Sequence, residues 1–117
     1  MNGRPLRDKS YLFAIRIVEL CKMLINSKKE YILSKQILRS GTAIGALIRE
    51  AEFGQSKADF TNKLSVALKE ANETLYWISL LKDTHYIDAK LYASLEEDCK
   101  ELIKMLVSSV KTSKANK

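Results

Sequence analysis

Residues that interrupt helices or commonly bind metals are scarce in this sequence. Its 117 residues include one proline, four glycines, two cysteines and one histidine. With so few helix breakers and many Leu, Ile, Ala, Lys and Glu, the composition favours helix over β-structure. Cys21 and Cys99 lack Cys-x-x-Cys spacing, so we expect buried free thiols in a cytoplasmic protein. The single histidine, His85, argues against a zinc site.

Long apolar runs are also missing. The longest are only a few residues, too short to span a bilayer. After the basic start, the apolar stretch is interrupted by Arg16, Glu19 and Lys22, which is not the pattern of a secretory signal. The length predicts one domain, residues 1–117, with its own core.

Positive charge exceeds negative charge, and the excess is unevenly placed. Lys and Arg number 20 and Asp and Glu 14, a formal net charge of +6. Residues 1–29 carry seven basic and two acidic side chains, residues 30–86 seven of each, and residues 87–110 three basic and five acidic. Residues 111–117 carry three lysines and no acid. The basic excess therefore lies at the two ends of the chain.

Four segments show apolar residues at spacings of three and four, which is typical of amphipathic helices. They predict helices at about 8–27, 34–53, 56–83 and 88–111, followed by a frayed basic tail. We expect Ser34, Ser56 and Asp88 to be N-caps, with Asp59 completing a capping box. Gly54 fits a left-handed residue after the second helix. The short connections predict an all-α, antiparallel up-down-up-down four-helix bundle.

This topology brings particular chain segments to one end of the bundle. The starts of the first and third helices meet the ends of the second and fourth there. The acidic residues Asp8, Glu50, Glu52 and Asp59 fall at the same end. The basic residues outnumber them, so we expect a basic end, a nucleic-acid-binding surface formed by Arg4, Arg7, Lys9, Arg49, Lys57, Lys111, Lys114 and Lys117.

Small residues form an unusual stretch inside the second predicted helix. Gly41 and Gly45 lie four residues apart, on one helix face. Glycine inside a helix costs about 1 kcal/mol relative to alanine, so we expect a neighbouring backbone to pack closely against both, within the subunit or across subunits. The run lacks the lysine and the strand-to-helix context of a phosphate-binding loop.

Acidic and aromatic residues on the third predicted helix suggest packing roles. A carboxylate metal cluster of Glu50, Glu70 and Glu73 would need Glu-x-x-His pairs that the chain lacks. We instead expect Glu70 and Glu73 to pair with a basic residue of a neighbouring helix or subunit. Tyr76 and Trp77 point about 100° apart, so one side chain could enter the core while the other lies at an interface.

Several motifs resemble one protein family. They are S-G-T-x-I-G-A from Ser40, the Glu50-Ala51 pair, S-K-A-D-F from Ser56, and K-E-A-x-E-T-x-Y-W from Lys69. Together they resemble the bacterial four-helix-bundle proteins encoded in intervening sequences of 23S ribosomal RNA genes, most clearly over residues 31–81. Ala43 stands where the family usually has serine, and Leu47 where it has asparagine, which puts any shared polar role of those positions in doubt.

The resemblance implies a left-handed four-helix bundle and, from similar members, a ring-shaped homopentamer. It also implies kinship with accessory proteins of diversity-generating retroelements, which are basic pentamers associated with nucleic acid and a reverse transcriptase. Members encoded in intervening sequences have no established biochemical activity. The resemblance therefore indicates the fold more firmly than the function.

Two functions remain open on the sequence. An oligomer could bind structured RNA or DNA through its basic surface, with a reverse transcriptase as a partner, or it could be a protein-interaction scaffold without nucleic acid. No nucleophile, base or metal constellation indicates an enzyme, and no cofactor or small-molecule substrate is expected. We favour nucleic-acid binding.

Overall fold

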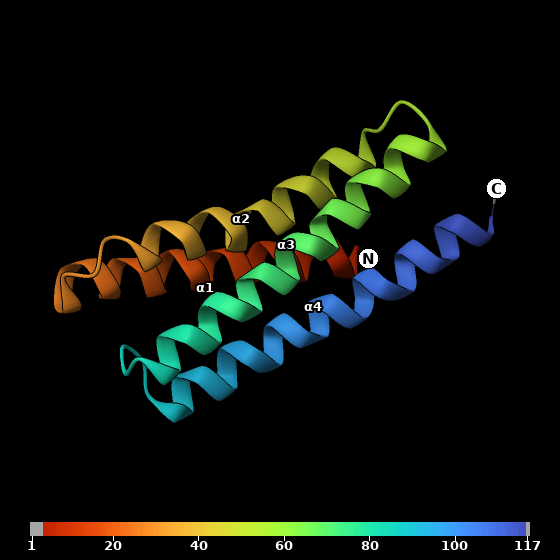
Figure 1. Ribbon diagram of the computed structural model, residues 1–117. Helices are drawn as coiled ribbons and strands as arrows, with labels where there is room; N and C mark the ends of the chain where they lie inside the picture. Colours follow the sequence, from red (N-terminus) through yellow and green to blue (C-terminus); the bar gives the residue numbers. More distant parts are fainter. Residues whose placement is uncertain (1–3, 117) are drawn as a thin grey trace.

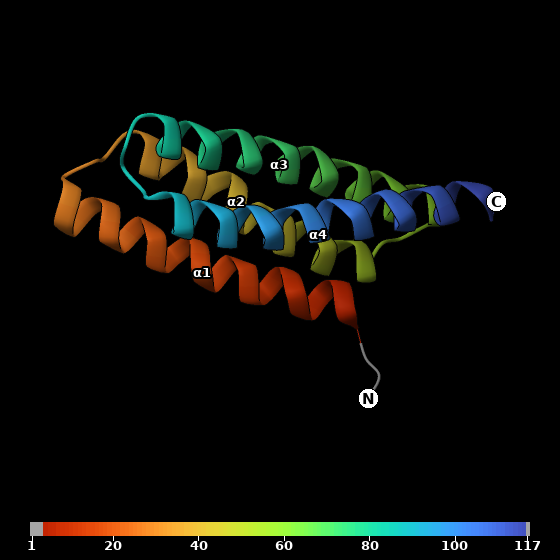
Figure 2. The same ribbon diagram turned by 90° about the horizontal axis from the view of Figure 1, so that it is seen from below.

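Four α-helices make up nearly all of the computed structural model, which describes residues 4–116. They are α1 (Pro5–Lys28), α2 (Leu33–Glu52), α3 (Lys57–Asp83) and α4 (Ala89–Ala115). Successive helices run in opposite directions along one long axis (Figures 1 and 2). Residues 4–116 contain no strand. The predicted all-α four-helix fold is confirmed.

The helices share one hydrophobic core, but they do not pack evenly. Extensive contacts join α2 to α1 and to α3, and α3 to α4, whereas α1 and α4 meet over a much smaller area. The largest fully buried apolar side chains come from every helix: Phe13, Ile17, Leu24, Ile37, Ile44, Ile78, Leu81, Leu95, Leu102 and Leu106. The bundle is therefore tightest around α2 and α3 and more open between α1 and α4.

Two helices are longer than the apolar pattern predicts. Helix α1 begins at Pro5, whose ring favours the first helical position. Helix α4 continues to Ala115, so the predicted fraying from Thr112 is wrong. Ser113 is buried in this last turn and its hydroxyl is hydrogen bonded to that of Thr61. This tertiary contact with α3 accounts for helical order that the local sequence does not predict.

The start of α2 uses a different cap from the predicted one. Ser34 is already helical and buried, and Ile32 is the N-cap residue. The Glu30 carboxylate accepts hydrogen bonds from the backbone N–H groups of Ile32, Leu33 and Ser34 at 3.2, 3.0 and 2.8 Å. The Ser34 prediction is wrong because the longer Glu30 side chain, which precedes the helix, satisfies the N–H groups that have no partner inside it.

The other two N-caps are as predicted, but the capping box is not complete, because the Asp59 carboxylate accepts from the Gln55 N–H at 3.3 Å instead of from the Ser56 N–H. The Ser56 hydroxyl accepts from the Asp59 N–H at 3.1 Å, and the Asp88 carboxylate accepts from the Leu91 N–H at 2.8 Å.

The residues that adopt a left-handed backbone conformation are not the glycine that the sequence predicted, Gly54. Gly54 does not have positive φ, so the expected left-handed glycine is wrong. Lys29 and His85 adopt φ of 55° and 69° instead. Lys29 directly follows α1, and its N–H bonds the Leu24 carbonyl, so it ends that helix in the way usually reserved for glycine.

Within residues 4–116, none of the helices combines the length and apolarity that crossing a membrane requires.

Candidate functional site

One end of the bundle collects basic side chains from all four helices. Contacts between helix termini hold this end together, because Arg4 Nη1 lies 3.1 Å from Glu52 Oε1 and Thr61 is hydrogen bonded to Ser113. Of the residues predicted to gather here, Lys117 lies outside the described residues. The others lie near the starts of α1 and α3 and the ends of α2 and α4: Arg4, Arg7, Lys9, Arg49, Lys57, Lys111 and Lys114. We call this group the basic end.

On the α1/α2 side of the basic end, the charges are largely compensated. Arg4 and Arg7 both approach Glu52, at 3.1 and 3.7 Å. Lys9 lies 2.9 Å from Glu101, and this hydrogen bond raises the pKa of Lys9 above its ordinary 10.5.

Arg49 completes this side with a contact to an aromatic ring. Its guanidinium carbon lies 5.9 Å from the centroid of the Tyr11 ring, within range of a cation–π interaction. Arg49 also lines a hollow of about 290 Å³ between α1 and α2. The arginines of this side therefore already have partners within the subunit.

On the α3/α4 side, the lysines lack such partners. Within residues 4–116, Lys57, Lys111 and Lys114 form no ion pair. Between the start of α3 and the end of α4 lies a hollow of about 680 Å³. Apart from one alanine, the residues that line it are lysines and small polar residues, although most of the wall surface that they expose is apolar: Lys57, Ala58, Thr61, Asn62, Ser65, Ser113 and Lys114. We call this the polar hollow.

The sequence did not single out the uncharged residues of the polar hollow. Thr61, Asn62 and Ser65 look like ordinary solvated positions, and Ser113 falls in the segment expected to fray. Their spacing carries one signal, because Lys57, Thr61 and Ser65 recur every four residues and so share a helix face. Only the packing of α4 against α3 brings that face to Ser113 and Lys114.

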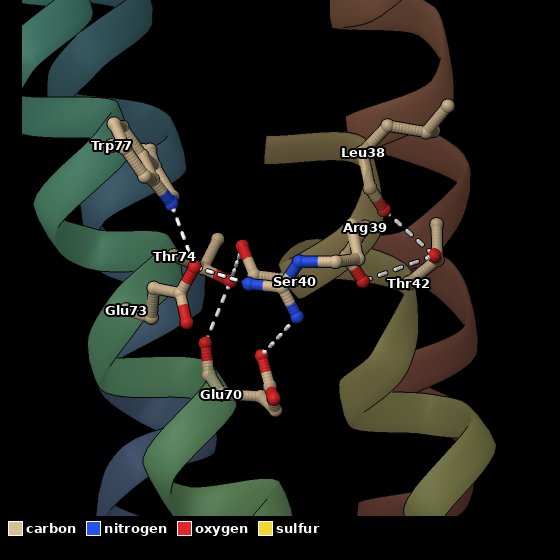
Figure 3. Close-up of polar contacts among 8 residues, drawn as sticks. All are labelled: Leu38, Arg39, Ser40, Thr42, Glu70, Glu73, Thr74 and Trp77. Atoms are coloured by element: carbon tan, nitrogen blue, oxygen red, sulfur yellow. Dashed lines mark hydrogen bonds and ion pairs between the residues drawn. The ribbon is translucent and has the colours of Figure 1, made fainter. Parts of the chain in front are cut away.

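A second polar cluster joins α2 to α3 near the middle of the bundle (Figure 3). Arg39 reaches across to both acidic residues, with Nη1 3.1 Å from Glu70 Oε1 and Nη2 hydrogen bonded to Glu73. Trp77 Nε1–H donates to Glu73 Oε2 at 3.0 Å. The hydrogen bonds from Trp77 and Arg39 lower the pKa of Glu73 below its ordinary 4.5. In this structure both glutamates pair within the subunit.

A buried hydroxyl pair lies beside this cluster. Thr74 Oγ1 lies 2.8 Å from Ser40 Oγ and 2.8 Å from the Glu70 carbonyl oxygen, and its single proton donates to one of these oxygens at a time. Both Ser40 and Thr74 are fully buried, so each hydroxyl needs its partner. Both residues belong to the motifs that carry the family resemblance, but the sequence did not predict that their hydroxyls meet.

The two helical glycines face α1, but they meet different parts of it. A Cβ at Gly41 would lie 2.8 Å from Ile17 Cγ1 and 2.9 Å from Cγ2. A Cβ at Gly45 would lie 3.4 Å from the backbone oxygen of Ser10, an ordinary contact. The tighter approach is therefore at Gly41, and it involves a side chain rather than a backbone.

Tyr76 and Trp77 differ in burial as neighbouring helix positions should. Trp77 is partly buried against the core, whereas Tyr76 is 60% exposed. Their rings meet edge to face with centroids 5.0 Å apart. Tyr76 thus presents an aromatic surface to the outside of the bundle.

The open side between α1 and α4 exposes apolar side chains. A groove of about 430 Å³ there is lined in part by Leu12 and Ile15, which are 61% and 45% exposed. Arg16 and Asp98 form an ion pair of 2.8 Å across it. Such exposed apolar groups are typical of surfaces that contact other macromolecules.

The remaining predicted features lie in the core or at its edge. Within the described part of the chain, no three His, Cys, Asp or Glu residues cluster as metal ligands would. Burial raises the pKa of Cys21 to about 11 and that of Cys99 to about 12. Of the two departures from the family pattern, Leu47 packs against the core and Ala43 is half-buried.

Comparison with known proteins places this geometry among relatives. The family described as 23S rRNA-intervening sequence protein matches residues 6–108. A solved structure from Bacteroides thetaiotaomicron VPI-5482, described as a protein with unknown function from the S23 ribosomal protein family, is 58% identical with a TM-score of 0.90. That match covers 91% of this chain and 98% of the other. A search of curated proteins found no match.

Proposed function

The chain belongs to the 23S rRNA-intervening sequence protein family, and we propose that it is a non-enzymatic, oligomeric, cytoplasmic protein that binds structured RNA or DNA. The observation that carries this proposal is the basic end, where cationic side chains from four helices meet. Phosphate contacts from lysine and arginine supply most of the sequence-independent affinity for nucleic acid. Binding through this surface is therefore electrostatic and weakly sequence-specific.

The proposed assembly is a homopentamer, as the family resemblance implies. A ring repeats each basic end about its axis, so the fields of moderately charged subunits add. The exposed Tyr76 and the groove containing Leu12 and Ile15 offer surfaces for neighbouring subunits. A reverse transcriptase or another nucleic-acid enzyme is the proposed protein partner, on the resemblance alone.

Titration of the protein into a labelled structured RNA, at two salt concentrations, tests the proposed function. We expect a Kd of roughly micromolar at low salt that weakens steeply as salt rises. A DNA hairpin of the same stem sequence should bind with a similar salt dependence, because the contacts are to phosphates. No binding of either polymer at low salt would refute the proposal. Light scattering after size exclusion measures the oligomeric state separately.

A protein-interaction scaffold is the second candidate function. The exposure of Leu12 and Ile15 along the α1/α4 groove favours it, since these apolar groups gain by contact with a protein and gain little from nucleic acid. In that case charge only keeps the protein dispersed. Replacement of both residues by serine would then abolish assembly with a partner or with further copies, while the titration with RNA would show no binding.

A further inference from the structure

The two sides of the basic end differ in how much positive charge remains uncompensated. Arg4 and Arg7 share the carboxylate of Glu52, and Lys9 pairs with Glu101. To contact phosphate, these side chains must first leave a carboxylate partner. Lys57 and Lys114 have no such partner within residues 4–116, so a phosphate displaces only water and counterions from them.

The chemistry of the polar hollow fits a sugar–phosphate backbone. The Thr61 and Ser113 hydroxyls are bonded to each other and to the Lys57 carbonyl, which leaves the Asn62 amide and the Ser65 hydroxyl to donate to anionic oxygens. None of the described residues that line the hollow is acidic. Among residues 4–116, those that line the hollow include no aromatic ring on which a base could stack. Its volume of about 680 Å³ lies in the ordinary range of ligand sites, and exceeds the space that one small anion requires.

The walls of the hollow come from two packed helices, α3 and α4, so its shape does not depend on the conformation of a single lysine side chain. Lys57 comes from the first turn of α3 and Lys114 from the last turn of α4. The Thr61–Ser113 hydrogen bond ties these two turns together and buries Ser113. Deeper along the same pair of helices, the contact becomes apolar at Leu64 and Leu106. The polar lining is therefore confined to the end of the bundle, where α4 extends beyond the start of α1 (Figures 1 and 2).

We propose that the polar hollow is the principal site at which this protein binds the phosphates of nucleic acid. It would hold one backbone phosphate and the adjoining sugar between Lys57 and Lys114. Lys111, one turn earlier on α4, extends the positive track along the same helix. The arginines of the α1/α2 side contribute mainly long-range attraction. This inference rests on nucleic-acid binding as the proposed function, and it assigns that binding to one side of the basic end.

Two double variants with equal changes of charge test the assignment. Lys57→Gln with Lys114→Gln removes two positive charges from the hollow, and Arg4→Gln with Arg7→Gln removes two from the α1/α2 side. With a labelled RNA hairpin, we expect the first variant to weaken binding about 10-fold to 100-fold and to reduce the salt slope by about one to two units. The second should weaken binding no more than about threefold, because its charges are already compensated.

A charge-preserving pair separates binding from folding. Lys57→Arg with Lys114→Arg should keep most of the affinity, and thermal unfolding of both lysine variants should stay close to wild type because both lysines are exposed. Inorganic phosphate at the same phosphate concentration should compete only weakly with the hairpin. Competition as strong as that of unlabelled RNA would show a site for free phosphate, and would overturn the assignment.

The outcomes distinguish this inference from the function on which it rests. If wild type binds and the two double variants lose affinity equally, or only the arginine variant loses it, the hollow is not the principal site and the proposed function still holds. If wild type binds neither RNA nor DNA at low salt, the proposed function fails first.

Discussion

Replacement of Gly41 with alanine should destabilise the wild-type protein but stabilise a variant in which Ile17 has been shortened to alanine. The added Cβ would lie 2.8 and 2.9 Å from the two γ-carbons of Ile17, and both residues are buried. Overpacking of this kind typically costs about 1–3 kcal/mol. Alanine in place of glycine inside a helix gains about 1 kcal/mol. The net expectation in the wild-type background is therefore about 0–2 kcal/mol of destabilisation.

The identity of residue 17 allows the two contributions to be separated. Ile17→Ala removes both γ-carbons and leaves only Cβ, 3.3 Å from the added carbon, so Gly41→Ala in that background should be stabilising by at most about 1 kcal/mol. Ile17→Val keeps both γ-carbons and is the matched control, in which Gly41→Ala should remain unfavourable. The coupling energy between Gly41→Ala and Ile17→Ala should thus be about 1–3 kcal/mol.

Urea unfolding followed by circular dichroism measures these free energies. All variants must be compared at one protein concentration, because assembly would add to the apparent stability. The reasoning is refuted if Gly41→Ala stabilises the wild-type protein by the full helix-propensity gain. It is also refuted if Ile17→Ala leaves the effect of Gly41→Ala unchanged.

Three further predictions concern caps, pH and thiols. Glu30→Ala should lower the free energy of unfolding by about 2–3 kcal/mol, because three backbone N–H groups lose the buried carboxylate that they bond. Ser56→Ala should lower it by only about 1 kcal/mol, and equal losses in urea unfolding would contradict this. The Glu73 pKa is lowered, so the stability from its ionised form is present above about pH 4.5 and is lost as pH falls through the folded pKa. The stability advantage of wild type over Glu73→Gln should shrink on acidification; a constant difference would show that the contact is weak. Burial and raised pKa values should protect Cys21 and Cys99 from iodoacetamide near neutral pH until denaturant is added, and mass spectrometry of the native protein would reveal any adduct.

Local patterns were sufficient where a residue acts on its own neighbours in the chain. The spacing of apolar residues predicted four helices, and Ser56 and Asp88 cap α3 and α4 as expected. The same reasoning failed at Ser34 and Gly54. The Glu30 carboxylate, in the segment before α2, caps the start of that helix. The end of α2 is followed by Gly54, which does not adopt the left-handed conformation. Several local solutions exist for a helix end, and a single sequence does not tell which one the chain adopts.

The sequence predicted where in the bundle the candidate site lies, but not which side chains form it. Helix order brought Lys57 and Lys114 to one end of the bundle. Chain order also placed Glu52 at this end, but the sequence could not tell that Glu52 would pair with Arg4, or that Glu101 would pair with Lys9, because those pairs join residues far apart in the chain. It also missed the hydroxyls of the polar hollow, since isolated threonines and serines on a helix look solvated until another helix packs beside them.

By itself, the sequence determined the helical fold class, the number of helices and the gathering of basic residues at one end, since these depend on hydrophobic periodicity and on chain order. Only the tertiary structure decided which cations remain uncompensated, that Gly41 meets Ile17 more tightly than Gly45 meets Ser10, and that α4 stays helical through Ser113. The physical reason is the same in each case. Ion pairing, close packing and burial depend on distances between helices, and those distances are set by the whole core rather than by any local pattern.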